Sequence, residues 1–172
     1  YMSSLKDFKI LYSKRLIIRP LAIKDSFFIL ELVNSEGWLK YIGDRNVQSL
    51  TDSNEYIQSI INNNKSFYFV FEDQKSREVL GIISFLFRNE YKNPDLGFAL
   101  LPQYEKKGYT YEACNAFLEE LRMNGMNPNI IAITMESNIA SISLLVKLGF
   151  KKSDLPKTDN LIIFSKDLTS GI

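Results

Sequence analysis

The sequence predicts one α/β (α+β) domain over residues 1–172, in which a mixed β-sheet carries helices on both faces. Two observations favour this fold class. Apolar residues follow a helical period in some segments and a period of two in others, in the order β, α, α, β, β, β, α, β, α, β. In addition, 45% of the 172 residues are hydrophobic, so the chain can bury a full core without a second domain.

The first half of the sequence combines one short strand with several helices. An apolar run over residues 16–20 ends at Pro20 and predicts the first strand. Asp25 lies near the start of the first expected helix. Asp52, followed three residues later by Glu55, predicts a capping-box start for the last of these helices. The expected helices cover residues 23–34, 37–41 and 53–63.

Strands dominate the second half of the sequence. A polar turn over residues 73–77 separates two β-rich runs and predicts a hairpin. Apolar residues recur at helical spacing from Ala113 to Leu121 and predict a helix after Gly108. Another helix is expected over residues 138–148. The expected strands cover residues 67–71, 79–88, 95–101, 130–135 and 161–164.

Composition and charge exclude several classes of function. The 21 Lys and Arg residues nearly balance 20 Asp and Glu, and no basic face carries spaced aromatics, so nucleic acid is not an expected partner. Histidine is absent, which removes Ser-His and Cys-His hydrolase sites and most catalytic zinc sites, so no metal is expected. No apolar stretch has the length or form of a membrane span or signal peptide, so no membrane partner is expected.

Cys114 is the single cysteine of the sequence. It lies beside Ala113 and near Phe117 in an expected amphipathic helix, and it is interpreted as a core residue. One cysteine cannot form an internal disulfide, and a cytoplasmic location is the resulting expectation.

The junction after the strand at residues 95–101 has the features of a pyrophosphate site. The strand leads through a basic turn containing Gly108 into the helix that starts near Tyr111. Free N–H groups at a helix start converge, the helix dipole favours an anion there, and a glycine allows close approach. Such turns are common in α/β domains, so this feature alone is a weak signal.

Two coupled motifs resemble those of the GNAT N-acetyltransferases, most closely the branch with the ribosomal-protein N-terminal acetyltransferases. The first is the run at residues 97–102 followed by Lys107-Gly108-Tyr109 and Glu112-Ala113. The second is the run from Asn138 to Ser141, which leads to Leu148-Gly149-Phe150. The resemblance spans residues 15–150. It implies the GNAT acyl-CoA N-acyltransferase fold, with a mostly antiparallel sheet.

The same resemblance implies an acyltransferase that uses acetyl-CoA as cosubstrate. The acceptor would be a primary amine, either a protein N-terminus or a small molecule. Polyamine or aminoglycoside acetylation is an alternative, and so is a CoA-binding module without catalysis. Exposed strand edges in this fold favour a homodimer.

The resemblance also implies cofactor contacts. Pantetheine would lie between two splayed strands beside Leu100 and Leu101, and a strand N–H near Leu100 could stabilise the carbonyl oxygen in catalysis. Asn138 and Ser141 could bond to the pantetheine amides, although Asn138 could equally be a helix N-cap. The N–H groups of the turn would hold the pyrophosphate, with two lysines nearby. The turn residues are Lys106, Lys107, Gly108, Tyr109 and Thr110.

Three positions depart from the family pattern. Glu105 and Thr110 stand where relatives carry Gln or Arg and Gly or Ala, and Glu105 brings negative charge toward a phosphate site. Leu145 occupies the position of a tyrosine that protonates the leaving thiolate in many relatives, so no general acid is assigned. Glu136, at a strand end, is the candidate base, and its alternative is a solvated carboxylate.

A separate set of residues is the expected acceptor site. It lies in the region after the first helix and around the loop at residues 89–94, and an aspartate there would attract a protonated amine. The alternative is purely structural, with Asp44 pairing with Arg45 and Asp95 pairing with Arg88. The expected residues are Trp38, Tyr41, Asp44, Arg45, Arg88 and Asp95.

Overall fold

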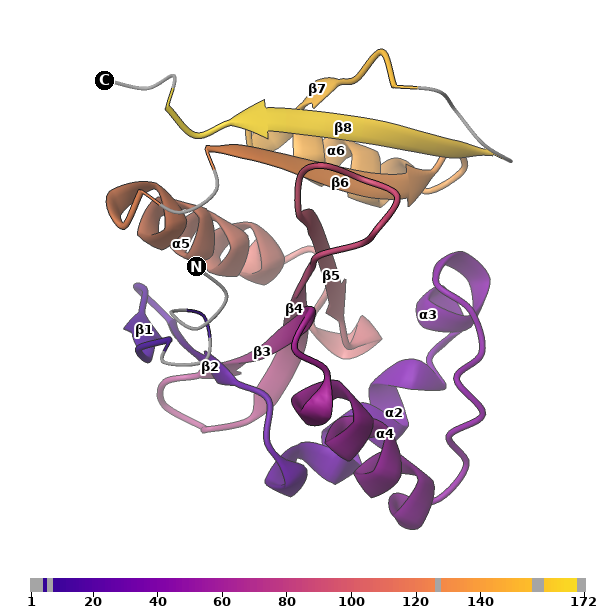
Figure 1. The fold of residues 1–172 in the computed structure, drawn as a ribbon. Coiled ribbons are helices and arrows are strands. Elements are labelled where there is room, and N and C mark those ends of the chain that lie inside the picture. The colour runs from indigo at the N-terminus through magenta and orange to yellow at the C-terminus, as the bar shows by residue number, and fades with distance from the viewer. Residues whose placement is uncertain (1–4, 6–7, 126–127, 156–159, 170–172) are drawn as a thin grey trace.

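The computed structural model describes residue 5 and residues 8–125, 128–155 and 160–169. Within these residues the strands form an eight-stranded sheet in the order β1-β2-β3-β4-β5-β6-β8-β7 (Figure 1). Neighbouring strands are antiparallel except β5 and β6, which are parallel, so the predicted mixed, mostly antiparallel sheet is confirmed. The strands are β1 (Leu11–Tyr12), β2 (Leu16–Pro20), β3 (Ser66–Asp73), β4 (Val79–Leu86), β5 (Asp95–Leu100), β6 (Asn129–Met135), β7 (Lys151–Lys152) and β8 (Leu161–Asp167).

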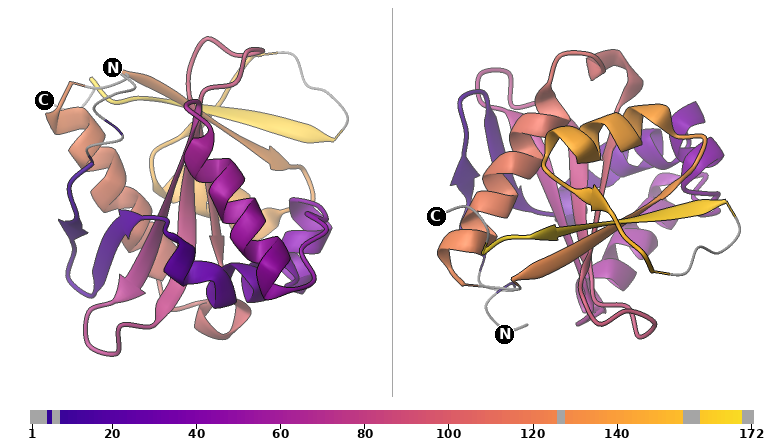
Figure 2. Two further views of the ribbon diagram at one scale, coloured as in Figure 1. Left: turned by 60° about the horizontal axis from the view of Figure 1, so that its bottom comes forward. Right: turned by 90° about the horizontal axis from the view of Figure 1, so that it is seen from above.

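Helices cover both faces of the sheet, as predicted (Figure 2). Successive residues of β3 supply two separate cores, because side chains alternate across a strand. Phe69 packs with Phe117 of α5 on one face, whereas Val70 packs with Ile29 of α2 and Ile57 of α4 on the other. The helices are η1 (Ile23–Asp25), α2 (Ser26–Val33), α3 (Glu36–Tyr41), α4 (Leu50–Asn62), η2 (Pro102–Tyr104), α5 (Tyr109–Met123) and α6 (Ile139–Lys147).

The predicted start of α4 is wrong by one turn. The helix begins at Leu50, and Ser49 is its N-cap, because the Ser49 hydroxyl accepts the Asp52 N–H at 3.1 Å. Asp52 therefore lies inside the first turn, where its carboxylate accepts the Gln48 N–H at 2.9 Å. The spacing of Asp52 and Glu55 alone predicts a capping pair, but Ser49 provides the cap that the helix uses.

Strands β5 and β6 separate soon after they meet. They pair in register only at Asp95 with Ile131, where the Ile131 N–H donates to the Pro94 carbonyl at 2.9 Å. On its other side β5 pairs with β4 along its whole length, from Asp95 to Leu100. The side of β5 that faces β6 is therefore open toward Leu100.

No helix in the described ranges is long and apolar enough to cross a bilayer. The sheet ends in β1 at one edge and β7 at the other, and each has two residues. Short edge strands limit pairing between sheets. The homodimer expected from exposed edges stays a prediction.

Candidate active site

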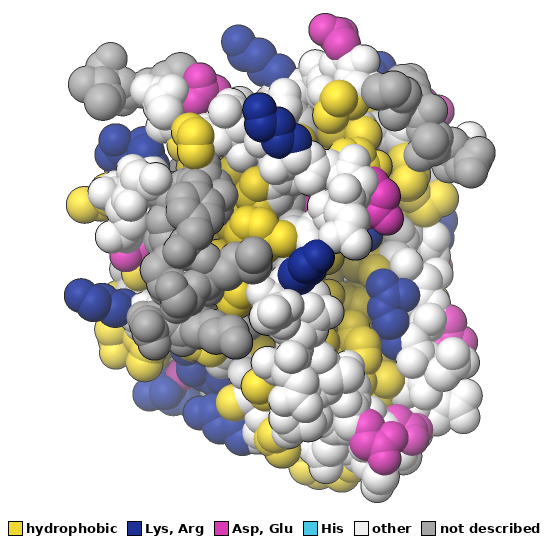
Figure 3. Space-filling model, viewed as in Figure 1, with side chains coloured by type: hydrophobic (Ala, Val, Ile, Leu, Met, Phe, Trp, Pro, Cys, Tyr) yellow, Lys and Arg dark blue, Asp and Glu magenta, His cyan; other side chains and the backbone are white. Residues whose placement is uncertain are grey.

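A cavity of about 940 Å³ fills the gap between β5 and β6 and extends to α3. In the space-filling view, Lys and Arg side chains flank a hollow with a hydrophobic floor (Figure 3). The cavity brings together most of the residues predicted for cofactor and acceptor. The predicted residues that line it are Leu100, Lys106, Gly108, Tyr109, Thr110, Asn138, Ser141, Trp38, Tyr41, Arg45, Arg88 and Asp95.

The turn before α5 has an unusual backbone that exposes the helix start. Lys106 and Gly108 both have left-handed backbones, with φ of +62° and +77°. Gly108 is the N-cap of α5, and no side chain caps the helix there. The first N–H groups of α5 are therefore available to an anion at the cavity edge.

Arg15 was not among the site residues predicted from the sequence. It contacts this turn but does not line the cavity. Its Nη1 donates to the Lys107 carbonyl at 2.9 Å, and its guanidinium lies 4.2 Å from the centre of the Tyr109 ring. Glu112 in the first turn of α5 fixes Arg15 by accepting bonds from its backbone N–H and its Nε, each at 2.7 Å. The turn between β1 and β2 thus supports the expected phosphate site and adds a positive charge beside it.

The backbone of β5 supports the role predicted for Leu100. The Leu101 N–H donates to the Leu80 carbonyl at 2.9 Å, toward β4. Because N–H directions alternate along a strand, the N–H groups of Leu100 and Phe98 point toward the gap with β6. Leu101 itself is 3% exposed and packs in the core under α2 and α4, so its side chain lies away from the cavity.

At the start of α6, Asn138 acts as the helix cap. Its side-chain oxygen accepts the Ser141 N–H at 3.2 Å, which confirms the structural alternative for this residue. Both residues line the cavity, so a cofactor contact remains a prediction. Leu145 is 1% exposed and offers no proton donor.

At the α3 end of the cavity, Arg88 and Asp95 form the ion pair that the structural alternative predicted. Arg88 Nε lies 2.8 Å from Asp95 Oδ2. Burial raises the pKa of Asp95, although the Arg88 charge and hydrogen bond oppose this shift. The Asp95 carboxylate is thus already paired with Arg88.

The predicted pairing of Asp44 with Arg45 is not found between these two described residues. Asp44 accepts the Asn46 N–H at 2.7 Å and does not line the cavity, and the Arg45 guanidinium lies 5.8 Å from the centre of the Trp38 ring. The aromatic ring offers Arg45 a cation–π contact in place of a surface ion pair.

Two further predicted residues lie outside the cavity lining. Glu136 follows β6 with an exposed side chain, and Lys107 is exposed at the turn. Sequence reasoning also missed several polar lining residues. For Tyr68 a signal existed, because it stands between Phe67 and Phe69 and so faces the opposite side of β3. The missed residues include Tyr68, Ser84, Glu90, Tyr91, Tyr111, Thr134 and Lys147.

Comparisons with known proteins agree with this architecture. The family model described as Acetyltransferase (GNAT) domain matches residues 15–151. Two Bacillus subtilis (strain 168) proteins called uncharacterized N-acetyltransferases are similar: YoaA is 24% identical over 150 residues, 84% of each chain, and YnaD is 27% identical over 141 residues, 81% of each chain.

Among solved structures, ribosomal-protein-S5-alanine acetyltransferase from Vibrio fischeri superposes with a TM-score of 0.77 at 19% identity, over 95% of this chain and 98% of that one. Ribosomal L7/L12 α-N-protein acetyltransferase in complex with coenzyme A gives 0.78 at 15% identity, over 92% and 98%. The chain thus shares its fold with acetyltransferases of known structure. The chain belongs to the GNAT acetyltransferase family, as its sequence motifs predicted.

Proposed function

We propose that this protein transfers an acetyl group from acetyl-CoA to a primary amine, on a protein N-terminus or a small molecule. The cavity between β5 and β6 carries the proposal, because it joins a helix-start anion site to a polar pocket beside α3. The pyrophosphate would bind the N–H groups around Gly108, with the Lys106 charge nearby. Pantetheine would extend along β5 toward the acceptor end.

The chemistry is direct attack of the amine nitrogen on the thioester carbon. A C–N bond forms while the carbonyl oxygen gains negative charge, and the C–S bond then breaks to release CoA thiolate. The attacking nitrogen loses one proton in this step, and the thiolate takes up a proton to give free CoA. The N–H of Leu100 or Phe98 would stabilise that oxygen, and holding both substrates in line supplies much of the rate. An α-amino group with a pKa of about 8 is partly neutral near pH 7, so its demand for a base is small.

The test compares two glycines that both have left-handed backbones at opposite ends of α5. Gly108 has φ of +77° at the cavity, and Gly125 has φ of +61° beyond the last turn of the helix. Gly108→Glu places a carboxylate at the proposed phosphate site. Gly125→Glu imposes similar backbone strain and the same charge far from it.

Thermal unfolding is measured with and without acetyl-CoA. At about 100 times its dissociation constant, the ligand should stabilise the wild type and Gly125→Glu by roughly 2.7 kcal/mol, and Gly108→Glu much less. Release of free CoA on adding an amine then measures turnover. Equal stabilisation of all three proteins would contradict the assigned cofactor site, and stabilisation without CoA release from any amine would contradict acetyl transfer.

A further inference from the structure

We infer that the acceptor amine carries an anionic group, a carboxylate or a phosphate, which binds between Arg45 and Arg88 at the α3 end of the cavity. This inference deepens the proposed function and rests on it for the identity of the amine. The observations that carry it are the hydrogen-bond donors that line this end and have no acceptor within the described residues.

Trp38 provides the first of these donors. Its side chain lines the cavity, the residue is 5% exposed, and its indole Nε1–H is buried without a hydrogen-bond partner among the described residues. A buried donor without a partner is unfavourable, so a ligand that supplies an acceptor here would gain a hydrogen bond on binding.

The two arginines supply the positive charge. Arg45 forms no ion pair with any described residue and lies over the Trp38 ring. Arg88 uses its Nε for Asp95, which leaves its two terminal nitrogens free of described acceptors. A guanidinium presents several donors in a planar fork that matches a carboxylate or phosphate.

The acidic groups at this end do not cancel this preference. Asp95 is already paired with Arg88, and Glu90 is exposed where it lines the cavity. Glu90 can attract the ammonium of an incoming substrate while the arginines hold its anion. A polyamine would instead bring several cations and no anion toward Arg45, which is unfavourable.

Binding is tested with matched amines and the chain's single tryptophan, Trp38, as the reporter. Phosphoethanolamine is compared with ethanolamine, and β-alanine with propylamine, so that the members of each pair differ mainly in the anion. We expect a saturable change in Trp38 fluorescence with the anion-bearing member of at least one pair and none with ethanolamine or propylamine, which are cations without an anionic group. The two pairs distinguish phosphate from carboxylate.

Variants identify the binding residue. Arg45→Gln should weaken the fluorescence response on the order of tenfold, since one charge-assisted bond is worth about 1.4 kcal/mol or more. Lys40→Gln removes the same charge from α3 at an exposed residue that does not line the cavity, and it should leave the response unchanged. Gly108→Glu should also leave it unchanged, which excludes anion binding at the phosphate turn as its cause.

Turnover with the same amines distinguishes binding at the anion site from acetyl transfer. CoA release that favours the anionic members and loses that preference in Arg45→Gln supports the inference. Equal or faster release with propylamine or spermidine, and no fluorescence response to either anion, overturns it while acetyl transfer stands. A fluorescence response that Arg45→Gln abolishes, without CoA release from any amine, supports the anion site and contradicts the proposed function.

Discussion

At the scale of single residues, burial decides what a side chain can do. Cys114 lies on the buried face of α5 and is fully buried, and burial raises the pKa of its thiol well above the ordinary value. A thiol that is both protonated and inaccessible is a poor nucleophile. The helical spacing around Cys114 already predicted this role.

We predict that the native protein does not react with a coloured thiol reagent over the minutes of an assay. In concentrated urea, one thiol per chain should react, since the sequence holds one cysteine. Rapid stoichiometric reaction in native buffer would contradict the burial. The prediction has a practical consequence, because thiol released during turnover can then be assigned to CoA.

The sequence predicted residues of the site where a local pattern marked them. Gly108 follows a strand and precedes a helix, so the local pattern marked it, and Asn138 was predicted from the family motif at the start of the next helix. Arg15 could not be found in this way, because its contacts with Lys107 and Glu112 span 92 and 97 residues of sequence. Only the packing of the β1–β2 turn on α5 brings these groups together.

At the scale of elements, the contact between the β1–β2 turn and α5 depends on one carboxylate. Glu112 accepts hydrogen bonds from the Ser13 hydroxyl, the Arg15 N–H and the Arg15 Nε, each at 2.7 Å. Partial burial acts to raise the pKa of Glu112, but these bonds and the Arg15 charge outweigh it and lower the pKa below its ordinary value of 4.5. The folded protein therefore binds this proton less tightly than the unfolded chain does.

The sign of the pH dependence follows from this lowered pKa. The stabilisation from Glu112 is present above pH 4.5 and is lost as the pH falls through the lower folded pKa. We predict that Glu112→Gln lowers the free energy of unfolding by about 2 kcal/mol near neutral pH and by less in acid. Urea unfolding at several pH values measures the difference, and a constant difference would contradict the assignment.

The same variant also tests whether the contact supports the phosphate turn. Loss of Glu112 as an acceptor should release Arg15 and weaken acetyl-CoA binding. Glu119→Gln is a matched control, because Glu119 lies on the same helix in an exposed pair with Arg122. It should change acetyl-CoA binding little.

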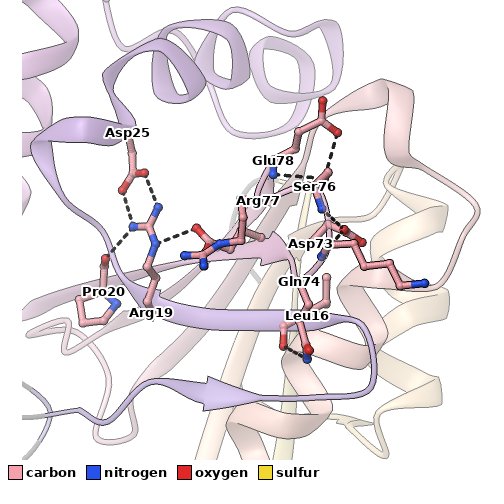
Figure 4. A network of polar contacts seen from close by, with 11 residues as sticks. Leu16, Arg19, Pro20, Asp25, Asp73, Gln74, Ser76, Arg77 and Glu78 are labelled. Atoms are coloured by element: carbon pink, nitrogen blue, oxygen red, sulfur yellow. Dashed lines mark hydrogen bonds and ion pairs between the residues drawn. The ribbon is translucent and has the colours of Figure 1, made fainter.

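At the scale of the whole molecule, buried charge joins the sheet to the helical layer on one of its faces. Figure 4 shows Arg19, near the end of β2, reaching Asp25 of η1. The two bonds of this pair measure 2.9 and 2.7 Å, and Arg19 Nε also donates to Glu72 of β3 at 2.9 Å. The three residues are between 2% and 8% exposed. Their sequence positions predicted a strand end and a helix start, but not that the ionised groups meet in the interior.

Arg19→Ala would leave Asp25 and Glu72 buried without this partner. Removing one member of a buried ion pair costs about 3–5 kcal/mol, so we predict a loss of this size in the free energy of unfolding. Arg77→Ala is the control, because Arg77 pairs with Glu72 at 2.6 Å from a side chain that is 62% exposed. The Arg77 guanidinium is mostly solvated, and Arg19 still pairs with the buried Glu72 carboxylate in this variant, so the expected loss is smaller than in Arg19→Ala. Urea unfolding measures the free energy of unfolding of both variants. If the two variants lose similar amounts, the buried ion pairs of Arg19 do not hold the helical layer on the sheet, and the apolar cores alone do so.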